Sequence, residues 1–118
     1  MATVKKRLLS GSTNGKQIKV AASVTPGTAI HTAVAGTTPG TVDEIWLWAC
    51  NHSNNNATLV IEFGGVANPD DHMVFIIPPW TFQAIVPGMI LQNGLSVAAY
   101  ATLANIITIS GFVNTITD

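Results

Sequence analysis

Short apolar runs separated by turn residues organise most of this 118-residue sequence. The runs are of strand length and rich in Val, Ile and Thr, while Gly, Pro and Asn occupy the positions between them. β-Branched residues favour strands, and turn residues of these types end them. Because no segment shows apolar residues at a 3.6-residue spacing with helix caps, the pattern predicts an all-β chain.

Eight of these runs are expected to form strands. They cover residues 17–23, 30–35, 42–51, 57–63, 72–77, 81–86, 95–102 and 106–113. Strands that recur every 8–12 residues or so are typical of antiparallel sandwiches and barrels. The sequence therefore predicts a single antiparallel β-sandwich, jelly-roll-like, over residues 16–118. The short connections at 52–56 and 103–105 are expected to close hairpins between their flanking strands.

Positive charge is confined to the beginning of the chain. All five cationic side chains lie within the first nineteen residues, and all six carboxylates follow them; the cations are Lys5, Lys6, Arg7, Lys16 and Lys19. Such asymmetry is typical of an interaction tail. Because Gly, Ser and Asn are frequent in 10–15, residues 1–15 are expected to form a flexible, extended basic arm. We predict that these five cations contact a partner protein, the first three foremost; a disordered, solubilising terminus is the alternative.

The rest of the chain carries little charge. Charged residues make up 9% of the sequence and hydrophobic residues 47%, whereas about 25% charged residues is usual. Surface charge helps to keep soluble proteins apart, so we predict that neighbouring subunits cover part of this surface; a neutral polar surface is the alternative. Trp80 follows two prolines, and Trp80 and Phe82 are expected to pack at a subunit interface. Trp46 and Trp48 share one strand face and are expected in the core.

The sequence offers no convincing catalytic or metal site. Cys50 and His52 would stand about 7 Å apart on one strand face, too far for the histidine to activate the thiol. Asp70 and Asp71 lack the further ligands of a calcium loop, and the histidines lack zinc-site spacing; Asp70 is expected to form a turn. No run approaches the roughly 18 apolar residues of a membrane helix. We therefore expect no enzymatic activity, no cofactor, no metal and no membrane.

Four segments follow one another from Val42 onward: VDEIWLWACNHSNNNATLVIEFGG, NPDDHMVFIIPP, VPGMILQNGLSVAAYA and NIITISGFVNTI. In the residue types of its segments and in their order, this block resembles small structural proteins of tailed bacteriophages. The resemblance implies a β-sandwich virion component, such as a capsid cement (decoration) protein or a small tail, baseplate or head–tail part. It also implies a homotrimer on the capsid surface, made in the host cytoplasm, with a terminal arm reaching adjacent capsid subunits.

The resulting expectation is a protein that binds and stabilises an assembled shell, with the major capsid protein or another virion protein as its partner. Two other classes stay open. One is a carbohydrate- or receptor-binding sandwich that uses Trp80 and the Asn-rich turn. The other is nucleic-acid binding by the arm, which three consecutive cations and an acidic body disfavour.

Overall fold

The computed structural model describes residues 2–118, which form nine strands and contain no helix that could span a membrane. The predicted all-β class is confirmed for these residues. The strands are β1 (Thr3–Leu8), β2 (Ile18–Lys19), β3 (Thr28–Thr32), β4 (Val42–Asn51), β5 (Ala57–Phe63), β6 (His72–Ile77), β7 (Phe82–Leu91), β8 (Ser96–Ala101) and β9 (Ile107–Thr117).

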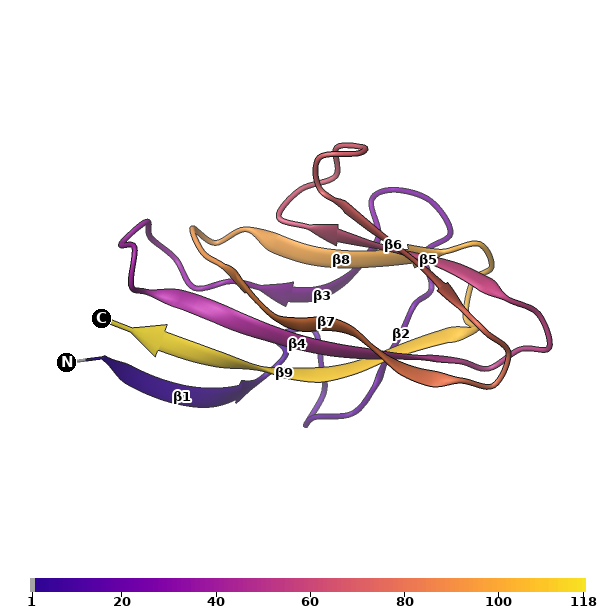
Figure 1. Cartoon of the computed structure of the whole chain (residues 1–118), viewed down its shortest axis with the longest axis horizontal. Helices are drawn as coiled ribbons and strands as arrows, with labels where there is room; N and C mark the ends of the chain where they lie inside the picture. Colours follow the sequence, from indigo (N-terminus) through magenta and orange to yellow (C-terminus); the bar gives the residue numbers. More distant parts are fainter. Residues whose placement is uncertain (1) are drawn as a thin grey trace.

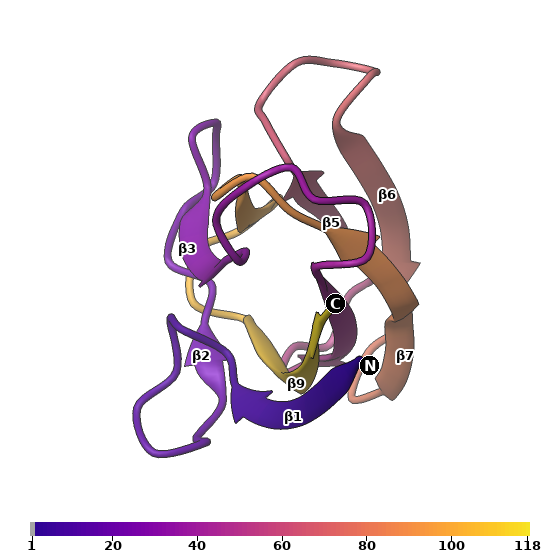
Figure 2. The same cartoon turned by 90° about the vertical axis from the view of Figure 1, so that its left-hand side faces the viewer.

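Two antiparallel sheets pack against each other (Figure 1). One has the order β1-β9-β4-β7, with β2 also paired to β9, and we call it sheet A. The other has the order β3-β8-β5-β6, and we call it sheet B. Seen from one end, the strands surround a centre that buried side chains fill (Figure 2). Both chain ends lie at the same end of the molecule (Figure 1).

Strand pairing is nested along the chain. β5 pairs with β6, β4 with β7, β3 with β8 and β2 with β9. The connections at 52–56 and 103–105 therefore do not close hairpins, because each joins a strand of one sheet to a strand of the other. The two predicted hairpins are wrong for this reason.

The core is built from the inward positions of alternating strands. In β4, Ile45, Leu47 and Ala49 are fully buried, and Leu59 and Ile61 of β5 meet them from sheet B. Burying a large aliphatic side chain contributes about 1.5–3 kcal/mol. These side chains come from two different sheets, so the core forms only when both sheets assemble.

Trp46 and Trp48 were predicted to lie in the core, and this prediction is wrong. They occupy the alternate positions of β4, on the outer face of sheet A, where they are half-buried. Because successive side chains of a strand point to opposite faces of the sheet, the two tryptophans face away from the aliphatic side chains of the same strand. The interior takes the smaller branched side chains, and the two indoles cover the sheet from outside.

The first residues of the chain also differ from the prediction. The extended arm over 1–15 is not confirmed, because residues 3–8 form β1 and pair with β9 from Thr3 opposite Thr117 to Leu8 opposite Phe112. Leu9, the next residue, is buried at 2% exposure. Met1 lies outside the described residues. Backbone pairing with a long neighbouring strand fixes this segment although all six of its side chains are exposed.

Candidate protein-interaction surface

The five predicted contact cations gather along one edge of sheet A. Lys5, Lys6 and Arg7 lie on β1, Lys19 lies on β2, and both strands pair with β9. Lys16 lies in the turn between them, where its backbone N–H donates to the Thr13 carbonyl oxygen at 3.0 Å. All five side chains are exposed. The fold thus converts a stretch of sequence into a basic edge, which we define by these five residues.

The cations of β1 point to two sides because strand residues alternate. Lys6 lies on the outer face of sheet A, with Nζ 4.7 Å from the centroid of the Phe112 ring. Arg7 faces the other way and lines a hollow together with His31 and Asp43. Among residues 2–118, no Lys or Arg forms an ion pair with a carboxylate. The basic edge is therefore available to carboxylates of another molecule.

An aromatic cluster covers the outer face of sheet A next to this edge. Phe112 of β9 stacks on Trp46 and Trp48 of β4, with centroids 6.3 and 6.1 Å apart. The Trp46 ring also lies over Gly88 of β7, where a Cβ would come within 2.6 Å of it. A glycine at this position lets the indole lie flat across the sheet.

Glu44 is the acidic member of the same face. Its Oε1 accepts hydrogen bonds from Asn114 Nδ2 at 3.0 Å and from Trp46 Nε1 at 2.7 Å. These two donors, Asn114 foremost, hold the pKa of Glu44 below its ordinary value because they stabilise the charged carboxylate. The side chain is thus a fixed anion beside the aromatic cluster.

Trp80 and Phe82 are exposed, at 65% and 58%. Trp80 lies between β6 and β7 with a φ of 53°, a backbone region that costs energy for a bulky residue. Its Nε1 donates to Asn54 Oδ1 at 2.9 Å, which holds the indole against the turn after β4. Phe82 begins β7 opposite Cys50. That these two side chains contact another subunit stays a prediction.

A buried polar cluster lies behind the basic edge and was missed in the sequence. The Ser10 N–H donates to His31 Nδ1 at 2.9 Å, so Nε2 carries the proton and donates to Asp43 Oδ2 at 2.7 Å. Thr115 donates its hydroxyl to Asp43 Oδ1 at 2.7 Å. Asp43 shares the inward parity of Ile45, which is the signal that could have revealed it. The cluster ties the N-terminal segment to the sandwich.

A second buried carboxylate lies on sheet B. Glu62 accepts hydrogen bonds from the Thr25 hydroxyl and from the Gly27 N–H at 2.6 Å. His72 Nε2 stands 3.7 Å from Glu62 Oε2 and has no hydrogen-bond partner among residues 2–118. The carboxylate thus fastens the loop before β3 onto the outer face of sheet B.

The other side chains that could take part in chemistry lie apart from one another. Cys50 is half-buried on β4, whereas the ring of exposed His52 meets the Thr108 hydroxyl at 3.0 Å. Asp71 Oδ2 accepts the Ala67 N–H at 3.1 Å, within its own loop. Within residues 2–118, no group of three or more His, Cys, Asp or Glu side chains is arranged to hold a metal.

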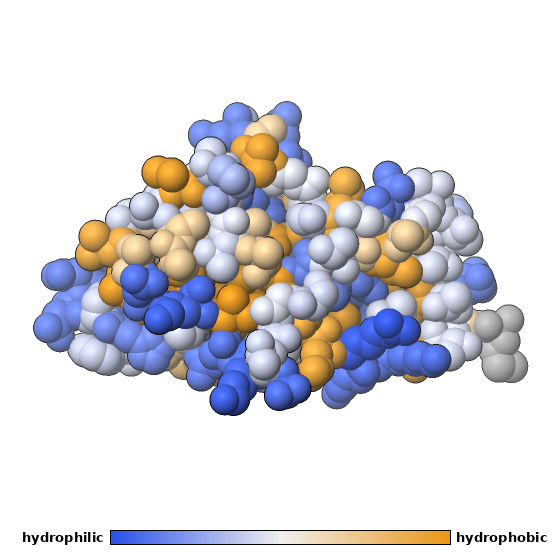
Figure 3. All heavy atoms as spheres, turned by 180° about the vertical axis from the view of Figure 1, so that it is seen from behind, coloured by the Kyte–Doolittle hydropathy of each residue, from blue (hydrophilic) through white to orange (hydrophobic). Residues whose placement is uncertain are grey.

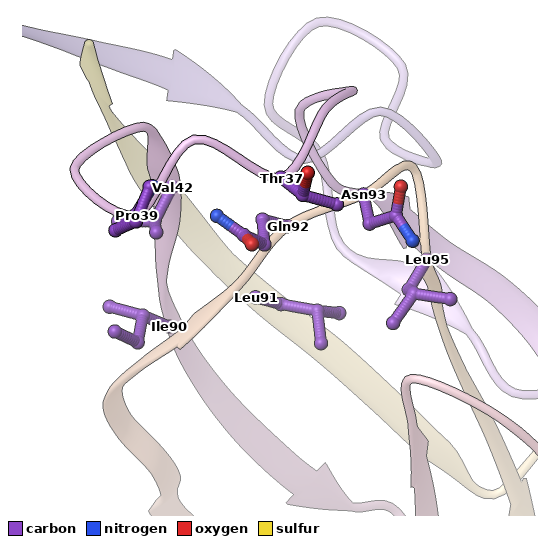
Figure 4. A pocket seen from close by; sticks show the side chains of 8 residues that line it. All are labelled: Thr37, Pro39, Val42, Ile90, Leu91, Gln92, Asn93 and Leu95. Carbon is purple, nitrogen blue, oxygen red and sulfur yellow. The ribbon is translucent and has the colours of Figure 1, made fainter. Parts of the chain in front are cut away.

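A hollow of about 470 Å³ opens at one end of the sandwich (Figure 4). Its walls are mostly aliphatic or amide side chains: Thr37, Pro39, Val42, Ile90, Leu91, Gln92, Asn93 and Leu95. Gln92 donates its amide hydrogens to the carbonyl oxygens of Thr38 and Thr41 at 2.9 and 3.0 Å, so it holds the loop before β4. None of the described residues that line the hollow is titratable.

Compared with protein-family models, with curated proteins and with solved structures, the chain matches none.

Proposed function

We propose that this chain is a structural virion protein that binds and stabilises an assembled phage shell, as cement proteins do. The observation that carries the proposal is the basic edge: five exposed cations lie on one side of a body that otherwise has no Lys or Arg. None of the five is used in an ion pair within the described residues. Unused charge gathered on one edge favours binding over catalysis.

The strand order supports a jelly-roll architecture for such a protein. β1-β9-β4-β7 faces β3-β8-β5-β6, and the nested pairs converge on the β5–β6 connection. Jelly rolls consist of two Greek keys and are frequent among viral capsid proteins. Fold alone does not give function, so the jelly-roll strand order supports the proposal only together with the basic edge.

Attachment to the shell is proposed to result from the sum of many weak contacts. An exposed ion pair is worth about 0.2–1 kcal/mol, so five cations supply modest affinity from each copy. Many copies on a symmetric shell, linked to one another, would gain avidity because each bound site raises the local concentration of the next. β1 also presents its unpaired edge, to which a strand of the shell protein can add.

Trypsin digestion tests the proposal, because every Lys and Arg of the chain belongs to the basic edge. We expect the free protein to be cut within β1 and the turn around Lys16. The shell-bound protein should be cut at least about tenfold more slowly, since the partner covers these residues. Equal cleavage rates for the free and the bound protein would refute docking by this edge.

A second candidate is glycan binding, which the fixed, exposed indole of Trp80 favours. Aromatic rings offer an apolar platform, and the neighbouring Asn54 to Asn56 turn supplies exposed amides. Titration of the isolated protein with an oligosaccharide panel would show saturable quenching of Trp80 fluorescence. The variant Trp80→Phe, which leaves Phe82 unchanged, would abolish this quenching. Absence of quenching across the panel would remove this candidate.

A further inference from the structure

We propose that the outer face of sheet A is the interface of a symmetric dimer of this chain. The face joins an uncovered aromatic cluster to two opposite charges that lie in one row across the sheet. This inference does not rest on shell binding. The two proposals share Lys6, which lies on the outer face, whereas Lys5 lies on the other side of β1 and takes part in shell binding alone.

Apolar side chains are left exposed around the aromatic cluster. Leu8 of β1 is 55% exposed and Ile90 of β7 is 59% exposed, on either side of the half-buried Trp46 and Phe112. Leu8 pairs with Phe112, and Phe112 pairs with Trp46, so the three form one continuous apolar row. Contiguous exposed apolar surface is typical of a contact site. Hydrophobic residues also reach the surface in separate patches on the side shown in Figure 3.

The next row of the sheet carries the charges. Lys6 pairs with Asn114, and Asn114 pairs with Glu44, so the cation and the anion lie on either side of β9. Neighbouring strands stand about 4.8 Å apart, which places the two charged residues about 10 Å apart at the backbone. Glu44 is bound to Asn114 and Trp46, and Lys6 lies over Phe112. Both charges are thus fixed in position without neutralising each other.

A two-fold axis parallel to β9 makes this face complementary to itself. Rotation about that axis places a second copy face to face with the first and exchanges the two sides of β9. Lys6 of each copy then lies over Glu44 of the other, and Leu8 lies over Trp46. Residue i contacting j while j contacts i is the pattern of an isologous interface. This charge complementarity is what selects a second copy over an unrelated apolar partner.

The available area fits a reversible dimer. Three strands about 4.8 Å apart and a β9 of 11 residues at about 3.4 Å each give a face on the order of 500 Å². Standard interfaces bury about 800 Å² per partner. The contact is therefore at the lower end of specific interfaces, and we expect a dimer whose population depends on concentration.

Sedimentation velocity with two charge reversals tests the dimer. Lys6→Glu and Glu44→Lys should each weaken dimerisation about tenfold or more, because each turns two symmetry-related attractions into repulsions. An equimolar mixture of the two variants should form a heterodimer, since opposite charges then face each other at both contacts: the two reversed residues at one and the two unchanged residues at the other. Unfolding of either variant is checked by circular dichroism, and recovery in the mixture itself requires folded protein.

Lys5→Glu is the matched control, since it makes the same charge change on the same strand. It should leave the dimer unchanged and weaken shell binding, so failure of one proposal is distinguishable from failure of the other. The dimer proposal is overturned by a wild-type protein that is monomeric at all concentrations. A trimer, a dimer that survives both reversals, or a mixture that stays monomeric also overturns it.

Discussion

Single residues with buried hydrogen-bond partners are where the body is most sensitive to substitution. Thr115 donates to a carboxylate oxygen of buried Asp43, whose other oxygen accepts from His31 and from the Val34 N–H. Thr115→Val keeps the shape but leaves Asp43 Oδ1 without its donor. We expect a loss of about 1–3 kcal/mol in the free energy of unfolding. Urea denaturation measures it.

Thr117→Val is the control for that substitution, because Thr117 lies two residues further along β9 and is exposed. It should change stability by less than about 0.5 kcal/mol. An equal effect of the two substitutions would mean that strand propensity, and not the buried carboxylate, sets the cost.

The ionisation of Glu44 depends on the donors that face it. Asn114→Ala removes the first of them and should raise the pKa of Glu44 toward its ordinary value of 4.5. Because the folded pKa is depressed, the bonds stabilise the fold above that ordinary value, and this contribution is lost as pH falls through the lowered pKa. Carboxyl chemical shifts followed through an acid titration measure the change.

Ser110 lies on the same face of β9 but forms no hydrogen bond with Asn114 or Trp46, the two donors to Glu44. The control substitution Ser110→Ala should therefore leave the pKa of Glu44 unchanged. A Glu44 pKa that stays the same in Asn114→Ala would contradict the role of this hydrogen bond.

At the scale of elements, β9 is the strand on which sheet A depends, since β1, β2 and β4 all pair with it. Gly111 lies in its middle with a φ of 155°, and a Cβ there would overlap the Trp46 carbonyl oxygen. Gly111→Ala must therefore separate β9 from β4, and we expect a loss of about 2 kcal/mol or more in thermal or urea unfolding.

Gly36→Ala separates the cost of the backbone conformation from the cost of the steric overlap. Gly36 also has a positive φ, 91°, but a Cβ there meets nothing within 4 Å. It should cost about 1 kcal/mol for backbone conformation alone. If it destabilised the protein as much as Gly111→Ala, the close approach to β4 would not be the reason.

β1 should be the least protected long strand. Its six side chains are all exposed, so backbone pairing with β9 is its main attachment, with Lys6 over the Phe112 ring in addition. Strands without buried side chains open locally at low free-energy cost. In hydrogen exchange, amides of β1 should exchange at least about tenfold faster than those of β4; equal protection would contradict this.

Much of the element pattern was predictable from sequence, whereas the pairing was not. β4, β5 and β6 have the predicted bounds because turn residues end each apolar run on both sides. The nested pairing depends on contacts between distant strands, which local patterns do not encode. Residues 45–50 are apolar on both faces, so alternation could not tell whether the tryptophans or Ile45 and Leu47 face inward. β1 was missed because Lys5, Lys6 and Arg7 conceal a strand that buries nothing.

For the molecule as a whole, the separation of charge in the sequence becomes a separation in space. The predicted contact cations were identified from sequence, and the fold places all of them on one edge of sheet A. The acidic partner of Lys6 in the proposed dimer, Glu44, could not have been chosen in advance. The pairing of Lys6 with Glu44 depends on the strand register that sets both residues opposite Asn114.

The central claim is that the basic edge attaches this protein to a shell. The most direct measurement is quantitative mass spectrometry of density-gradient fractions from phage-producing cells that express the wild-type chain or the double variant Lys5→Glu, Arg7→Glu. We predict that the wild-type protein bands with the heads at a fixed copy number and that the variant largely leaves that band. A wild-type protein found only in the free fractions would contradict the account.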